Sequence, residues 1–162
     1  MSGALLRVIS NKYFIFGLRL VLGGVFIYAS VYKIADPAAF AKSIYNYRMM
    51  PEATINLMAI VMPWLELVCG VLIIVGPLMR GSALLMGLML LVFIVAIGTA
   101  LARGLDISCG CFKVGDAAGR LVGLKTLIED ALMLAAVGLI LAFGGPSFNL
   151  KRAVRSDAAR AD

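Results

Sequence analysis

The stretch INLMAIVMPWLELVCGVLIIV, residues 55–75, is apolar except for Asn56 and one charged side chain, Glu66. A helix of about 20 apolar residues spans the hydrocarbon core of a bilayer. Three more stretches of this kind lie at 13–34, 81–101 and 121–143. Of the 162 residues, 62% are hydrophobic and 15% charged, whereas soluble domains are about half apolar and about a quarter charged. The sequence therefore predicts an all-α integral membrane protein, a four-helix bundle of four spans.

These spans predict one membrane domain, residues 1–145, followed by a basic tail at 146–162. A secretory signal peptide is the competing interpretation of the first span. Its apolar part is longer than the core of a signal peptide, and YASV is a poor cleavage site. We therefore interpret 13–34 as a retained span.

Between the first two spans, the sequence predicts a short interfacial helix. Asp36 suits the N-cap and Pro37 the first helical position. Phe40, Ile44 and Tyr47 then recur at helical spacing, which gives the segment one apolar face for the membrane surface. An ordinary polar loop is the alternative.

Charge and cysteine usage predict the orientation. The net charge is +6, but the basic residues cluster at the ends of the spans, which indicates lipid headgroups rather than nucleic acid as their partners. An even number of spans puts both termini on one side, where the tail is densest in Lys and Arg. We expect an inner-membrane protein with cytoplasmic termini and with Cys109 and Cys111 on the oxidising outer side.

The candidate catalytic residues are Cys109 and Cys111, which flank Gly110 after the third span. A disulfide across one flexible residue closes a strained, reducible ring that restrains little chain, so it suits electron exchange better than stabilisation. An inert pair and a metal site remain alternatives, although no histidine is present and Cys69 is the only other thiol. Cys69 lies deep in the second span, so we expect it to be a buried apolar residue.

Besides Lys33 at the outer end of the first span, five charged residues lie inside the predicted spans. Counted at about 1.5 Å per residue, Arg19, Glu66 and Asp130 share a level near mid-membrane, so we expect Arg19 to pair with one or both carboxylates. Lys125 and Glu129 are four residues apart near the outer mouth. This buried polar cluster is either a clamp that fixes helix packing or a pocket for protons or a quinone head group.

Several of these features resemble a known family. Arg19, GGVFIYASVYKIADPAAFAKSIYNYRMMP, PWLELVCG and CGCF are together similar to the DoxX-like group, specifically its MauE-type redox-associated membrane proteins. The family usually continues CGCFG, and here Lys113 replaces that glycine.

The resemblance implies a four-helix bundle linked to thiol or sulfur oxidation. MauE-type members are associated with disulfide formation in a periplasmic methylamine dehydrogenase subunit, and DoxX-type members with quinone-linked thiosulfate oxidation. The bundle is also similar to DsbB and vitamin K epoxide reductase proteins, which carry a C-x-x-C and further loop cysteines. This chain lacks the C-x-x-C and the further loop cysteines. Their absence indicates a thioredoxin-like or other disulfide-containing partner outside the cytoplasm.

Our leading hypothesis is a membrane thiol–disulfide oxidoreductase or redox accessory protein that acts through Cys109 and Cys111, with the quinone pool as a candidate acceptor. Lys33 and Lys113 are candidates to stabilise the thiolate. The alternative is a non-catalytic membrane subunit that anchors a periplasmic or sulfur-metabolising enzyme. A small transporter fits least, because the spans show no discontinuous repeat pair.

Overall fold

The computed structural model describes residues 11–48, 51–104 and 124–144. Every regular element in these ranges is a helix: α2 (Lys12–Ala35), α3 (Pro37–Asn46), α4 (Glu52–Val75), α5 (Met79–Ala102) and α6 (Leu124–Phe143). The four long ones are long and apolar enough to cross a membrane. The prediction of an all-α four-helix membrane bundle is confirmed. Residues 121–123 of the predicted fourth span and the predicted tail lie outside the described residues.

Local sequence signals explain where the helices begin and end. The Asn11 side chain accepts a hydrogen bond from the Tyr13 amide at the start of α2. Asp36 does the same for the Ala39 amide, with Pro37 as the first residue of α3, which confirms the predicted short helix. Gly76 ends α4 at a φ of 96°, a conformation that glycine adopts without steric cost. The placement of α3 at a membrane surface stays a prediction.

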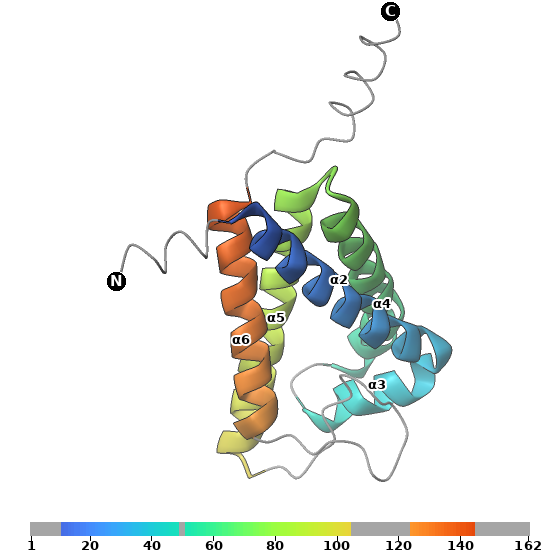
Figure 1. The fold of residues 1–162 in the computed structure, drawn as a ribbon. Helices are drawn as coiled ribbons and strands as arrows, with labels where there is room; N and C mark the ends of the chain where they lie inside the picture. The colour runs from blue at the N-terminus through green and yellow to red at the C-terminus, as the bar shows by residue number, and fades with distance from the viewer. Residues whose placement is uncertain (1–10, 49–50, 105–123, 145–162) are drawn as a thin grey trace, which may run out of the picture.

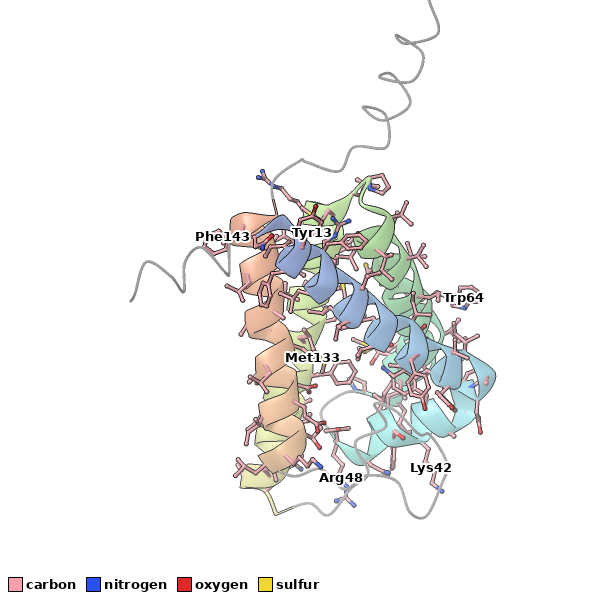
Figure 2. All side chains as sticks on the ribbon, viewed as in Figure 1. Tyr13, Lys42, Arg48, Trp64, Met133 and Phe143 are labelled. Carbon is pink, nitrogen blue, oxygen red and sulfur yellow. The ribbon has the colours of Figure 1, made fainter. Side chains whose placement is uncertain are left out.

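The helices form two closely packed pairs. The most extensive contacts join α2 to α4 and α5 to α6, and α2 runs obliquely across the bundle (Figure 1). One end of the bundle, here called the α3 end, carries α3 with Lys42, and Arg48 shortly after the helix; Tyr13 and Phe143 lie at the opposite end (Figure 2). The C-terminal end of α5 and the N-terminal end of α6 also lie at the α3 end (Figure 1).

Each long helix buries a stripe of residues at alternating spacings of four and three, the pattern of helices packed nearly side by side. The opposite faces expose large apolar side chains such as Leu84, Leu132 and Trp64 (Figure 2), as expected where lipid replaces water. The stripes of α2 and α4 consist of Arg19, Gly23, Phe26, Ser30 and Lys33, and of Ala59, Pro63, Glu66, Gly70 and Ile73.

Glycines at the centre of these two stripes allow α2 and α4 to approach closely. A Cβ atom added to Gly23 would lie 2.7 Å from the Gly70 carbonyl oxygen, and one added to Gly70 would lie 3.0 Å from the Gly23 carbonyl oxygen. Small residues at such contacts are typical of membrane helix pairs, whose association depends on close van der Waals packing. Gly23 and Gly70 thus set the register of the antiparallel α2–α4 pair.

Candidate functional site

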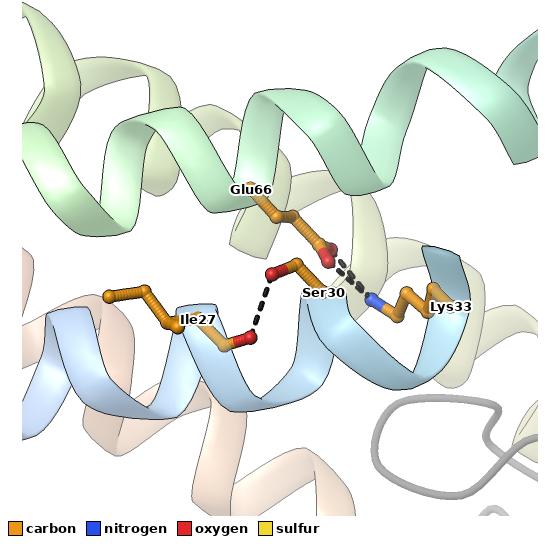
Figure 3. A network of polar contacts seen from close by, with 4 residues as sticks. All are labelled: Ile27, Ser30, Lys33 and Glu66. Carbon is orange, nitrogen blue, oxygen red and sulfur yellow. Dashed lines mark hydrogen bonds and ion pairs between the residues drawn. The ribbon is translucent and has the colours of Figure 1, made fainter. Parts of the chain in front are cut away.

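A buried ion pair joins α2 to α4. The Lys33 ammonium lies 2.6 Å from Oε1 and 2.8 Å from Oε2 of Glu66 (Figure 3). The two residues are only 2% and 3% exposed. Charges in such surroundings are costly unless they are paired, and here one carboxylate binds one ammonium through both oxygens.

The direction of helical side chains explains this pairing. Since Gly23 faces Gly70 in an antiparallel pair, Ser30 lies near the level of Pro63. Side chains on a helix lean toward its N-terminus. Lys33 on α2 and Glu66 on α4 therefore reach from opposite directions toward this common level. Ser30 lies beside the pair and donates a hydrogen bond to the Ile27 carbonyl at 2.7 Å (Figure 3).

Aromatic rings surround the remaining faces of the ammonium. The Lys33 nitrogen lies 5.0 Å from the ring centroid of Phe40 on α3 and 5.1 Å from that of Phe93 on α5. At this range the electron-rich face of a ring attracts a cation. Lys33 is thus held by three helices besides its own, through one carboxylate and two rings.

The predicted pairing of Arg19 with Glu66 or Asp130 is wrong. Arg19 Nε donates to the Ile73 carbonyl at 2.7 Å, and Nη2 donates to the Ile74 carbonyl at 3.0 Å. These carbonyls belong to the last turn of α4, where no further helical amide is available to bind them. A guanidinium also complements the negative end of the helix dipole. Arg19 therefore caps α4, and the negative end of the α4 dipole stabilises its positive charge.

The predicted polar cluster is only partly assembled. Asp130 on α6 is 4% exposed and lines a small cavity together with Lys33 and Glu66. Glu129 is partly exposed and Lys125 is exposed, so these two do not belong to the buried group. Thr126, one turn before Asp130, is buried on the same face of α6. Sequence reasoning did not single out Thr126, which is a buried polar neighbour of Asp130 on α6.

A larger apolar pocket lies beside the ion pair. Its volume is about 290 Å³, and α3, α4 and α5 border it. The rings of Phe40 and Phe93 belong both to this pocket and to the surroundings of Lys33. The remaining lining includes Ser43, Tyr47, Met58 and Met62. The pocket can accept an apolar or aromatic group next to the charged centre, separated from it by the rings.

The cysteine pair is not among the residues that the structure describes. Cys109, Gly110, Cys111 and Lys113 lie outside the described residues, so their predicted roles stay predictions. Cys69 is 2% exposed within α4, in agreement with the expected buried apolar role. The ammonium of Lys33, the other candidate stabiliser of the thiolate, binds Glu66, and its effect on the thiols stays a prediction.

The C-terminus of α3 is fastened to the end of α5. Arg103 Nη1 donates to the Tyr47 carbonyl at 3.3 Å, and the buried Tyr47 ring packs against Ile97 and Ala100. Burial, and secondly the nearby Asp130 carboxyl group, raise the pKa of Tyr47 to about 12. The phenol therefore stays uncharged at neutral pH. This contact between α3 and α5 lies next to Gly104, the last described residue before the gap at 105–123.

Taken together, the helices and the buried charges define a multi-pass α-helical membrane protein with a polar centre inside its bundle. The family described as Methylamine utilisation protein MauE matches residues 11–143, and the chain belongs to that family. The Methylamine utilization protein MauE of Paracoccus denitrificans is 33% identical over 133 residues, which cover 77% of this chain and 69% of that protein. No solved structure matches. The wider DoxX-like grouping stays a prediction.

One sequence signal could have identified the true partner of Glu66. Arg19, Phe26 and Lys33 are spaced by seven residues, two helical turns, so they lie on one face of α2. That spacing places Lys33 on the same interior stripe as Arg19. The aromatic neighbours Phe40 and Phe93 had no comparable signal, because their approach depends on how α3 and α5 pack.

Proposed function

We propose that this chain is a membrane thiol–disulfide redox protein that exchanges disulfides with an extracytoplasmic partner through Cys109 and Cys111. The observation that carries the proposal is the C-G-C pair in the α5–α6 connection of a MauE-family bundle. Membership supports a role in methylamine utilisation, the process named for the Paracoccus relative. The partner that we propose is a thioredoxin-like or disulfide-containing protein, and the orientation is the one predicted above.

The exchange itself is a two-step substitution at sulfur. A partner thiolate attacks the Cys109–Cys111 disulfide, so that this bond breaks and a mixed disulfide forms. The second partner thiolate then breaks the mixed disulfide. The partner leaves oxidised, and the pair is left as two thiols that have gained two electrons and two protons. Either cysteine can accept the first attack.

Regeneration of the disulfide needs an acceptor of two electrons and two protons. A quinone, which becomes a quinol, is the class of acceptor that we propose. The apolar pocket of about 290 Å³ at the α3 end supports this choice, because it offers room for a ring beside aromatic side chains. Phe40, Phe93 and the two methionines of α4 would bind the ring by apolar and aromatic contacts.

Serine variants in the native host test the proposal. Cys109→Ser and Cys111→Ser should each abolish growth on methylamine while the bundle still folds, because a ring across one residue holds no helices together. In thiol-blocked extracts, one single variant should retain its partner in a reducible covalent adduct, and the other should not. Cys69→Ala is the matched control, and its burial predicts wild-type behaviour.

The double variant Cys109→Ser/Cys111→Ser decides between redox chemistry and anchoring. Loss of growth with normal abundance in the membrane supports exchange. Full growth of this variant would show that the thiols are dispensable, and the non-catalytic anchoring subunit would then replace the redox proposal.

A further inference from the structure

A small cavity inside the bundle collects three ionisable side chains from three different helices. Lys33 of α2, Glu66 of α4 and Asp130 of α6 line it. Its volume is about 40 Å³, which is enough for at least one water molecule. The other walls are apolar and include Phe26, Met89, Phe93 and Met133.

Two buried polar atoms on one face of α6 have no partner within the described part of the chain. They are Oδ2 of Asp130, which lines the cavity, and Oγ1 of Thr126, one helical turn away. Both residues are almost fully buried, at 4% and 2% exposure. A buried polar atom without a hydrogen bond is costly, so a site of this kind normally holds water or an exchangeable proton.

The charges that surround Asp130 do not balance if every carboxyl group is ionised. On its own helix Glu129 adds negative charge, and across the cavity Lys33 adds the positive charge. Tyr47 at the end of α3 stays an uncharged phenol, because its pKa is raised to about 12. From α5, the cavity receives Met89, Leu90 and Phe93, which carry no charge.

One ammonium therefore serves two buried carboxyl groups, and Glu66 already binds it through both oxygens. An ionised Asp130 would add an unpaired negative charge to an apolar interior, at a cost that normally makes a group take up a proton instead.

We propose that Lys33, Glu66 and Asp130 form a proton-binding site in which Asp130 carries one exchangeable proton. In the loaded form, Asp130 is a neutral carboxylic acid and Lys33 is bound to Glu66. On release, the O–H bond of Asp130 breaks, the proton passes to water in the cavity, and the Lys33 ammonium is shared between two carboxylates. One proton enters or leaves, and no electrons move. The inference holds whether or not the cysteine pair exchanges disulfides.

Infrared spectroscopy of the purified full chain in lipid nanodiscs tests the site, because a protonated carboxyl group has its own C=O stretching band that shifts in heavy water. The wild type should show this band at neutral pH. Asp130→Asn should lose it, and Glu129→Gln, the neighbouring control, should keep it. Absence of the band in the wild type, or its survival in Asp130→Asn, overturns the proposal.

Two further variants distinguish a shared proton from a permanently neutral side chain. Glu66→Gln should lose the band although Asp130 is intact, because Asp130 then ionises as the counter-ion of Lys33. Lys33→Met should raise the band to about twice its area, because both buried carboxyl groups must then be neutral. A band that is unchanged in Glu66→Gln contradicts the sharing. Helical circular dichroism and gel filtration show that each compared variant is folded.

Discussion

Lys33 and Arg19 are both buried cations on α2, yet α4 offers them different partners. The compact ammonium of Lys33 binds one carboxylate, whereas the planar guanidinium of Arg19 reaches two adjacent carbonyls. This difference follows from their shapes, because Arg presents several donors in a fixed fork and Lys acts as a point charge. Each cation fastens α2 to a different level of α4.

The ion pair predicts a strong coupling between two substitutions. Lys33→Met leaves Glu66 buried without its partner and should lower the free energy of unfolding by about 3–5 kcal/mol at neutral pH. Lys33→Met/Glu66→Met removes both charges and should recover most of that loss, because a well-packed apolar pair can replace a buried ion pair. The measurement is thermal unfolding in detergent at matched concentrations. A double variant less stable than either single variant would contradict the pairing.

At the scale of the helices, the α2–α4 interface depends on two glycines, which carry no side chain. Gly23 and Gly70 leave no room for a methyl group on either side. The adjacent Gly24 has nothing within 4 Å of an added Cβ atom and is exposed. The chain therefore contains its own control for the effect of glycine on helix propensity.

Alanine at these three positions should separate packing from propensity. Gly23→Ala and Gly70→Ala should each lower stability by about 1–3 kcal/mol, because the added carbon meets the backbone of the facing helix. Gly24→Ala should be neutral or stabilising by up to about 1 kcal/mol, as expected for an exposed helical glycine. Melting temperatures of the purified variants give the comparison. Equal effects at Gly23 and Gly24 would show that the close helix contact is wrong.

Hydropathy and capping residues were sufficient to predict the helices, since membrane spans and the Asp36-Pro37 start of α3 depend on local sequence. The partners inside the bundle were harder. Depth counted from the predicted span ends placed Arg19 level with Glu66, whereas the Gly23–Gly70 contact places Arg19 level with Ile74 in the antiparallel pair. The depth count also treated carboxylates as the only partners, whereas the unpaired carbonyls of Ile73 and Ile74 bind Arg19.

The whole molecule has two unlike ends, and this makes its orientation measurable. The α3 end carries an additional helix with the exposed Lys42, and the opposite end carries the exposed Arg80 in the first turn of α5. If the termini are cytoplasmic, as predicted, Lys42 faces the outside and Arg80 the cytoplasm.

Introduced cysteines test this orientation in cells. In a background with Cys69→Ala, Cys109→Ser and Cys111→Ser, a membrane-impermeant thiol reagent should label Lys42→Cys in intact cells. Arg80→Cys should be labelled only after lysis, because the membrane keeps the reagent from the inner side. Both positions are exposed in the folded chain, so access to the protein surface is matched. The reverse labelling pattern inverts the bundle.

The position of Phe40 determines what happens to the ion pair when α3 is displaced. Its ring is 2% exposed and lies against the Lys33 ammonium, although the helix that carries it lies at the end of the bundle. If a partner protein bound the polar face of α3 and moved this helix away from the bundle, Phe40 would leave the Lys33 ammonium. Water would then reach the buried ion pair. A displacement of α3 would thereby change the electrostatic environment of the Lys33–Glu66 pair inside the bundle.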